Sequence, residues 1–295
     1  MRRFLLSVAL AAAGLATGAL LPASGDTRGR ATFLGTYVWE GNWEGFGGFS
    51  GLEVANDGLA FTALSDRVEL VSGHLTRDAR GVVTGVEVGP PRRLINTDGR
   101  PLRGRPADSE GLAIGRDGTV WISFEGRARV RREGGEAESP VLLPSHPDFG
   151  RLRLNSALEA LAVDDQDRLY TIPERPFRSE SSFRVYRFES GAWDVVFRLP
   201  ERDGFAVAGA DIGPDGRLYI LERDFTGLGF RTRLRRVNLD GSGEKTLLTT
   251  ATGTFDNLEG VAVWADGSGL RATMISDDNL RFFQQTQIVD YRLPD

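Results

Sequence analysis

Short apolar strands separated by acidic turns recur along this chain. The clearest copies are EGLAIGRDGTVWISFE from Glu110, EALAVDDQDRLYTIPE from Glu159 and EGVAVWADGSGLRATMISD from Glu259. A fourth copy, ADIGPDGRLYILER, begins near Asp211, and a degenerate fifth, SGLEVANDGLAFTALSDR, begins at Ser50. Alternating apolar and polar positions predict β-strands, and Asp-Gly pairs predict the tight turns between them.

The turn residues of the five copies set the period of the repeat. They are Gly58, Gly118, Asp167, Gly216 and Gly267, separated by 60, 49, 49 and 51 residues. A repeat of about 50 residues that contains four short strands is typical of the blades of a β-propeller. We therefore predict an all-β fold, a single β-propeller built from five repeat units, with no amphipathic helix.

The two ends of the repeat array are expected to pair. The last unit runs out after three strands, in TQIVDYRLPD, while residues 31–39 (ATFLGTYVW) form a strand that belongs to no unit. We expect this N-terminal strand to close the last blade, because closure removes exposed sheet edges. The count is five blades, or six if residues 40–50 or the long first unit contain another. An open β-sandwich is the alternative architecture.

The composition agrees with a single folded domain and disfavours one class of binding partner. The 295 residues are 40% hydrophobic and 26% charged, enough for a sizeable core. No cysteine is present, so packing and strand pairing must hold the fold together. A formal net charge of −5 disfavours nucleic acid as a partner.

The N-terminal segment differs from the rest of the chain. Within residues 1–25, Arg2 and Arg3 precede an apolar run from Phe4 to Leu21, followed by small residues. This order is typical of a secretory signal peptide. We expect a periplasmic or secreted protein, unattached to the membrane after signal removal, whose propeller domain spans residues 26–295.

The repeated carboxylates indicate where chemistry would occur. Both ends of an inner hairpin of a blade lie on the same face, so acids at these ends should form a rim around one mouth of the channel. The candidates for an inner, catalytic ring are Glu110, Glu159, Glu259 and Asp211. The candidates for metal ligands around it are Asp66, Glu125, Glu174, Glu222, Asn155, Asn257 and Asp277.

Such a rim needs positive charge, because crowded carboxylates repel and raise each other's pKa values. Carboxylate and Asn oxygens are the ligands that Ca²⁺ prefers, so a divalent cation, Ca²⁺, is one expectation. Arginines are the other. Arg67, Arg175 and Arg223 each follow an acid and are candidates for binding an anionic substrate. The alternative is that these acid-arginine pairs only tie neighbouring blades together.

Four short segments together resemble the phytase-like family, also described as the esterase-like activity of phytase domain. They are LSDR at 64–67, DSEGL at 108–112, LEAL at 158–161 and DNLEG at 256–260. The resemblance implies a repeated domain rich in Glu and Asp with phosphoesterase activity, and it assigns no catalytic residue.

The leading hypothesis is an exported hydrolase that cleaves a small-molecule phosphoester or ester with the help of a divalent cation. Two alternatives remain open at this point. One is a non-catalytic propeller that binds a ligand or a protein in the periplasm. The other is a calcium-dependent lactonase-like propeller.

Overall fold

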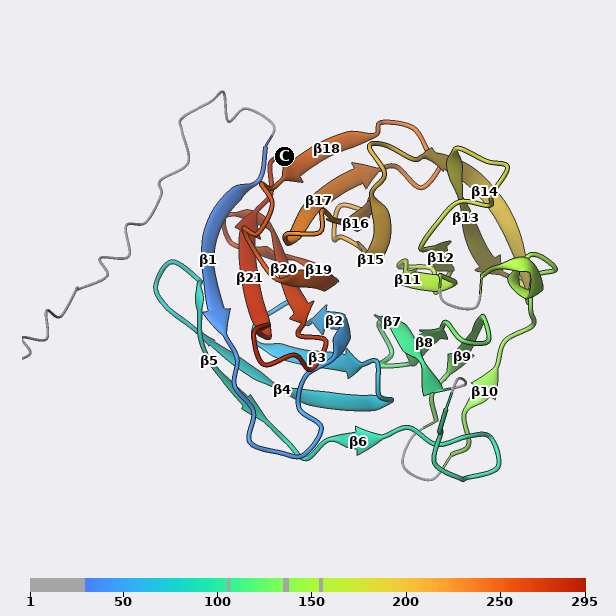
Figure 1. Cartoon of the computed structure of the whole chain (residues 1–295), viewed down its shortest axis with the longest axis horizontal. Coiled ribbons are helices and arrows are strands. Elements are labelled where there is room, and N and C mark those ends of the chain that lie inside the picture. Colours follow the sequence, from blue (N-terminus) through green and yellow to red (C-terminus); the bar gives the residue numbers. More distant parts are fainter. Residues whose placement is uncertain (1–29, 105–106, 135–137, 154–155) are drawn as a thin grey trace, which may run out of the picture.

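Five antiparallel sheets surround a central channel (Figure 1). The computed structural model describes residues 30–104, 107–134, 138–153 and 156–295. The expected signal peptide and Asn155 therefore lie outside the described residues. Within these ranges no helix is long and apolar enough to cross a membrane. The prediction of an all-β propeller is confirmed.

Each sheet is one blade, numbered here along the chain. Blade 1 contains β2 (Phe49–Val54), β3 (Ala60–Ser65), β4 (Glu69–Arg77) and β5 (Val83–Val88), with β6 (Arg92–Arg93) also paired to β4. Blade 2 contains β7 (Ser109–Ile114), β8 (Val120–Phe124), β9 (Arg129–Arg132) and β10 (Val141–Leu142). A 3-10 turn, η2 (Phe149–Arg151), leads to blade 3, which contains β11 (Leu158–Val163), β12 (Leu169–Pro173), β13 (Ser182–Glu189) and β14 (Ala192–Pro200). Blade 4 contains β15 (Ala206–Ile212), β16 (Leu218–Phe225), β17 (Phe230–Val237) and β18 (Lys245–Thr249).

Blade 5 joins the two ends of the chain. It contains β19 (Asn257–Asp266), β20 (Gly269–Asp277), β21 (Gln287–Arg292) and, as its outermost strand, β1 (Thr32–Val38). β1 pairs antiparallel with β21, from Thr32 opposite Arg292 to Val38 opposite Gln287. The predicted N-terminal closing strand is confirmed, and the alternative of an open β-sandwich is wrong.

A sixth blade is absent from the described residues. The segment between β1 and β2 instead packs aromatic side chains onto blade 1. Trp39 stacks on Phe49 with ring centroids 4.9 Å apart, and Phe46 meets Trp39 edge-on at 5.1 Å. The extra length of the first unit lies in the β4–β5 hairpin and in the connection through β6.

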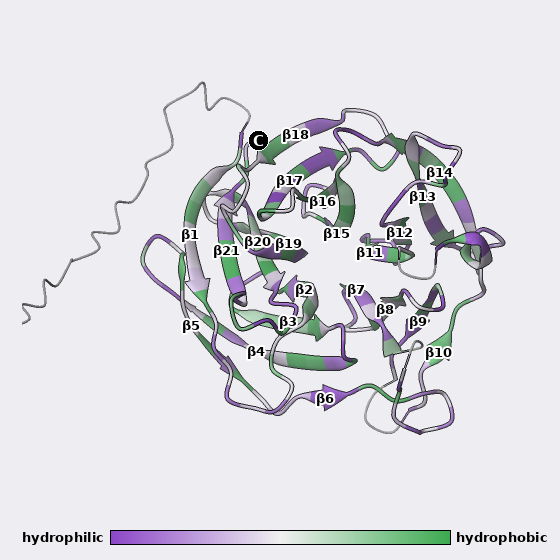
Figure 2. Cartoon of the chain, viewed as in Figure 1, coloured by the Kyte–Doolittle hydropathy of each residue, from purple (hydrophilic) through white to green (hydrophobic). Residues whose placement is uncertain are grey.

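The core consists of five apolar clusters, one between each pair of neighbouring blades. The outer strand β14 carries both hydrophobic and hydrophilic positions, as expected for a strand with one solvated face (Figure 2). Each blade buries its faces against two neighbours, so the ring is held by contacts around its whole circumference.

All five inner hairpins share one irregularity. The pairing register between the first and second strands shifts near the channel in every blade, which marks a β-bulge at Ser50, Glu110, Glu159, Ala208 and Glu259. The residue after each bulge is Gly, or Ala in blade 3, and it packs closely on the next blade. An added Cβ on Gly111 would lie 2.8 Å from the backbone nitrogen of Leu161.

Gly209 makes the tightest of these approaches and gives a stability prediction. A Cβ there would lie 2.2 Å from the backbone oxygen of Glu259, so one blade would have to move. We expect Gly209→Ala to lower the free energy of unfolding by about 1–3 kcal/mol. Urea denaturation measures this, with Gly267→Ala as the control because no atom lies within 4 Å of its added Cβ. Equal stability of the two variants would contradict the close packing.

Candidate functional site

Three of the five bulges carry carboxylates at one mouth of the channel. Glu110, Glu159 and Glu259 are 9%, 4% and 7% exposed. A bulge releases its residue from the strand ladder and re-aims the side chain, which is why these acids leave the blade and face the channel. Ser50 and Ala208 occupy the corresponding positions of blades 1 and 4.

A second set of side chains lies where each second strand ends at the same mouth. One residue per blade occupies this position: Asp66, Glu125, Glu174, Arg223 and Asp277. Four of the five are acids, and blade 4 supplies the arginine. The predicted rim of acids is therefore interrupted at one position, where Arg223 of blade 4 replaces an acid.

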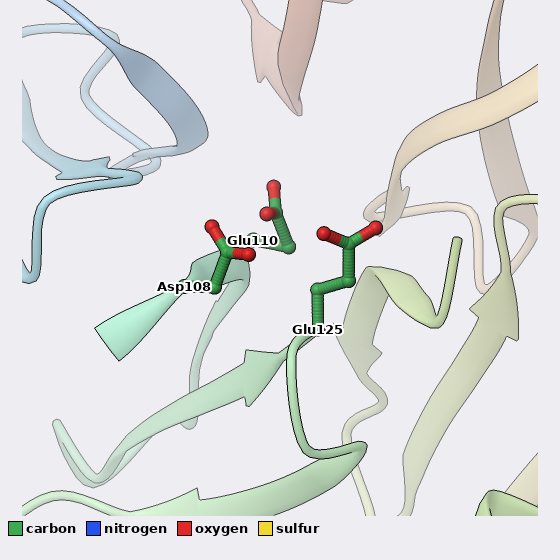
Figure 3. A group of neighbouring side chains, drawn as sticks. All are labelled: Asp108, Glu110 and Glu125. Atoms are coloured by element: carbon green, nitrogen blue, oxygen red, sulfur yellow. The ribbon is translucent and has the colours of Figure 1, made fainter. Parts of the chain in front are cut away.

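Asp108, Glu110 and Glu125 form the tightest group of acids at this mouth (Figure 3). One carboxylate oxygen from each lies within 4.8 Å of the other two, and all three side chains are partly buried. Asp108 directly precedes β7, Glu110 occupies its bulge and Glu125 follows β8. Three oxygen donors at this spacing could hold a hard divalent cation.

Arg223 connects the acids on the opposite side of the mouth. Its Nη1 donates to Asn257 Oδ1 at 3.0 Å and to the carboxylate of Glu259. Its Nη2 lies 3.6 Å from Glu174 Oε1. The Asn257 amide also donates to Glu259 at 2.7 Å, so Glu259 is held in one orientation by two neighbours.

The acids at the mouth raise one another's pKa. Burial raises the pKa of Glu110 well above its usual value, and the charges of Glu159 and Glu125 add to the effect. Burial likewise raises the pKa of Glu159, although Arg223 opposes the rise. Burial, with the nearby Asp277, raises the pKa of Asp66 to about 7.

Glu125 and Glu159 behave as a pair. Burial and the charge of Asp108 raise the pKa of Glu125 to about 7. Besides burial, the charges of Glu174 and Glu125 raise the pKa of Glu159. Both members of the pair therefore hold a proton more readily than an isolated carboxyl group.

The structure places Asp211 away from this group, so the expectation that it shares the mouth is wrong. Asp211 pairs with Tyr219 beside the β15–β16 turn, at the other end of the channel. Its Oδ2 accepts a hydrogen bond from Val263 N at 2.5 Å. Glu53, at the equivalent position of blade 1, accepts one from Ile114 N at 3.2 Å, and both acids line a cavity of about 1030 Å³. Glu53 was not among the predicted site residues, although it follows Ser50 by three positions as Asp211 follows Ala208.

Glu222 is also separate from the mouth. It is fully buried and accepts hydrogen bonds from Arg233 at 2.6 Å and from Arg235 at 2.8 Å. Because two arginines engage its carboxylate inside the protein, it is not available as a ligand at the mouth. The expectation that placed Glu222 in the rim is wrong, since its neighbour Arg223 occupies that position.

Arg67 and Arg175 lie at or near the same face. Arg67 lies 4.0 Å from Asp66 and is largely exposed. Arg175 donates to the backbone oxygen of Gly204 at 2.8 Å and contacts no carboxylate within the ranges that the structure covers. Asn155 lies outside the described residues.

The raised pKa of Glu125 gives a pH prediction for the cation-free protein. Folded Glu125 keeps its proton up to about pH 7, whereas in the unfolded chain the proton is released near the usual glutamate pKa of 4.5. The native state therefore binds more protons in this window, and stability falls as the pH rises through it. We expect the chelator-treated protein to be less stable at pH 8 than at pH 5, by about 2 kcal/mol after solvent screening.

Urea denaturation at both pH values measures this difference, and Glu125→Gln should reduce it. Added Ca²⁺ should restore most of the stability at pH 8. A metal-free protein that becomes more stable from pH 5 to pH 8 would contradict the proposed crowding of the acids.

Comparison with solved structures finds distant matches in several proteins. The PQQ-bound aldose sugar dehydrogenase of Streptomyces coelicolor is 15% identical over 88% of this chain and 98% of its own, with a TM-score of 0.45. A gluconolactonase of Xanthomonas campestris is 13% identical over 83% of this chain and 72% of its own, with a TM-score of 0.44. The calcium-binding protein regucalcin of Agrobacterium tumefaciens is 11% identical over 83% of this chain and 92% of its own, with a TM-score of 0.45.

Sequence comparison is more specific. No curated protein matches the chain. The family model described as phytase-like, esterase-like activity of phytase, matches residues 44–280, which include all five inner hairpins. The chain therefore belongs to the phytase-like family.

Proposed function

We propose that this protein hydrolyses phosphoesters at the acidic mouth with the help of a divalent cation, Ca²⁺. The observation that carries the proposal is the imbalance of charge at this mouth. Among the described residues, Arg223 is the one partly buried arginine that contacts the group, against eight carboxylates. The eight are Asp66, Asp108, Glu110, Glu125, Glu159, Glu174, Glu259 and Asp277.

The residues present suit a hard cation. Asp108, Glu110 and Glu125 offer oxygen donors alone, and no His or Cys takes part. Burial, together with the neighbouring carboxylates, raises the pKa values of Glu110 and Glu125, and a bound cation would offset both effects. When bound, Ca²⁺ would supply polarisation of a phosphoryl oxygen.

The other acids fit complementary roles. Burial raises the pKa of Glu159, which favours its protonated form, and that form can donate a proton to the leaving oxygen of a phosphoester. Glu259, oriented by Arg223 and Asn257, can accept a proton from an attacking water molecule. An acid on blade 3 and a base on blade 5 at one mouth can together promote hydrolysis.

The competing hypotheses differ in substrate and in their need for a cation. A binding propeller would be favoured if arginines neutralised all the acids, and the charge imbalance at the mouth speaks against it. Carboxylic esters and lactones require the same acid and base, so only substrate specificity separates them from phosphoesters. Export to the periplasm or medium, inferred from residues 1–25, is part of the proposal.

A chelator-controlled substrate screen tests the proposal. We expect p-nitrophenyl phosphate to be hydrolysed in the presence of Ca²⁺, with the activity lost in EDTA and restored by excess Ca²⁺. Faster hydrolysis of p-nitrophenyl acetate or a lactone would move the assignment to an esterase or lactonase. Absence of hydrolysis for all three substrate classes would refute an enzymatic role.

A further inference from the structure

Large apolar side chains project from the tips of two hairpins on the acidic mouth's face. The β16–β17 hairpin carries Phe225 and Leu228, which are 61% and 95% exposed. The β20–β21 hairpin carries Leu280, Phe282 and Phe283, which are 42%, 101% and 64% exposed. The four most exposed large apolar side chains of the described residues are all among these five. Single exposed apolar residues are common on protein surfaces, whereas such a group marks an interaction site.

Both hairpins reach their tips beyond the mouth. Arg223 of β16, which contacts acids at the mouth, comes two residues before Phe225. Asp277, the last residue of β20, comes three residues before Leu280. Blades 4 and 5 are neighbours in the ring (Figure 1). The exposed apolar side chains therefore stand on the face of the protein onto which the acidic mouth opens.

The two tips are connected through the segment that leads from β18 to β19. Gly253 N in this segment donates to Phe230 O of the β16–β17 hairpin at 2.9 Å. Further along the segment, Asp256 Oδ2 accepts a hydrogen bond from Gln285 N of the β20–β21 hairpin at 2.8 Å, and Gln284 donates to its Oδ1. Because both tips are bonded to one segment, their apolar side chains belong to one surface. We call this surface the apolar ledge, and it consists of Phe225, Leu228, Leu280, Phe282 and Phe283.

The chemistry of the apolar ledge suits a phospholipid surface. The β16–β17 tip, residues 225–230, contains no charged residue. In the other tip, the Arg281 guanidinium lies 6.0 Å from the ring centroid of Phe283, and it forms no ion pair with a carboxylate in the parts of the chain that the structure describes. Apolar side chains enter the acyl region of a bilayer, while an arginine beside them reaches the lipid phosphates.

The shape of the apolar ledge favours a bilayer over a second protein. Leu228 and Phe282 are almost completely uncovered by the rest of the chain, so they project outwards. A protein partner would need a matching pocket for each tip, whereas a fluid bilayer accepts protruding side chains without one. Since the chain has a formal net charge of −5, we expect apolar insertion to contribute more to binding than charge does.

We propose that the apolar ledge docks this protein reversibly onto a phospholipid bilayer, with Leu228 and Phe282 inserted among the acyl chains and Arg281 bound to a lipid phosphate. The acidic mouth then faces the membrane surface. This peripheral docking needs no membrane-spanning segment, and it differs from the expectation, drawn from the sequence, that the exported chain is unattached to the membrane. The docking stands on the apolar ledge alone and does not depend on the proposed hydrolysis.

Flotation with phosphatidylcholine vesicles, in buffer with EDTA, tests the docking without catalysis. The chain is used without residues 1–25, because their apolar run would itself bind lipid and all five blades are formed by later residues. We expect the Leu228→Ser, Phe282→Ser double variant to partition at least about tenfold more weakly than the wild-type sequence. The matched control is the Val141→Ser, Leu142→Ser double variant, which changes two half-exposed apolar residues of β10 and should partition within about twofold of wild type.

A label on the ledge gives a second readout. Because the chain contains no cysteine, Phe282→Cys and Leu142→Cys each provide one site for an environment-sensitive fluorophore. With vesicles, the emission of the label at position 282 should shift to shorter wavelength, and that of the label at position 142 should not. Equal behaviour of the two labels contradicts insertion of the ledge.

Absence of vesicle binding by the wild-type sequence overturns the proposal, and so does equal binding of the Leu228 and Phe282 double variant. A dimer in gel filtration that this double variant lacks, without vesicle binding, would identify a second copy of the chain as the occupant of the ledge and overturns membrane docking as well.

Discussion

Replacing both Glu110 and Glu125 with glutamine is expected to lower Ca²⁺-dependent phosphoester hydrolysis at least about 100-fold. The variant keeps the size of both side chains and removes two of the three carboxylates that lie within 4.8 Å of one another. Loss of a cation that polarises the phosphoryl oxygen costs several kcal/mol of transition-state stabilisation, and each 1.4 kcal/mol is about tenfold in rate.

The same substitutions should have opposite effects on stability with and without the cation. In EDTA, the variant should be at least as stable as wild type, because it removes two carboxylates whose pKa values are raised by burial and by neighbouring acids. With saturating Ca²⁺, wild type should gain about 5–10 °C in Tm and the variant little. Unchanged stability in EDTA together with a lost Tm gain in Ca²⁺ would show that the variant has lost cation binding and that its fold is intact.

The control for charge alone is the Glu87→Gln, Asp194→Asn variant, since both residues are exposed on outer strands. It should keep wild-type activity and the full thermal response to Ca²⁺. If the Glu110 and Glu125 variant hydrolyses substrate at the wild-type rate and still responds to Ca²⁺, the three acids do not hold the cation.

The sequence predicts the architecture well because the same strand pattern occurs five times, and each copy independently indicates one blade. The period gives five blades, and the unassigned strand at residues 31–39 identifies the closing β1. The alternation of apolar and polar residues also locates the strands of blade 3. The strands β11 to β14 overlap the predicted segments ALAV, RLYTI, FRVYRF and AWDVVFRL.

Blade 4 shows why the site is harder to predict than the fold. The segment ADIG looks like the start of a unit, yet β15 begins earlier, at Ala206, and Ala208 takes the bulge position held by acids elsewhere. Glu222 and Arg223 align by sequence with Glu174 and Arg175, but their register is offset by one residue. Because side chains alternate between faces along a strand, this offset buries Glu222 and turns Arg223 to the mouth.

The sequence places Glu110 and Glu125 at one mouth, but it does not predict that they lie close to each other and to Asp108. Asp108 precedes its strand and Glu125 follows the next one, so their distance depends on the bulge at Glu110. A bulge is a backbone irregularity that no residue type marks uniquely, since Ser, Ala and Glu all occupy it here. Spacing therefore identifies the mouth but not which acids meet.

The largest stability effect is expected from Glu222, inside blade 4. Its side chain and that of Arg235 are fully buried, and Arg233 is 4% exposed. We expect Glu222→Gln to lower the free energy of unfolding by about 3–5 kcal/mol, because it leaves two buried guanidinium groups without their shared carboxylate. Urea denaturation measures the loss, and Asp78→Asn, which breaks the largely exposed pair with Arg80, is the control, with less than about 1 kcal/mol expected.

This variant also decides between a structural and a ligand role for Glu222. As a buried partner of two arginines, it should leave the rise in Tm on adding Ca²⁺ equal to that of wild type, even though both melting temperatures are lower. A metal ligand would behave in the opposite way, with a small loss of stability in EDTA and no response to Ca²⁺. If Glu222→Gln abolishes the rise in Tm on adding Ca²⁺ and leaves stability in EDTA nearly unchanged, Glu222 is a metal ligand. The acidic site would then extend past Arg223 into blade 4.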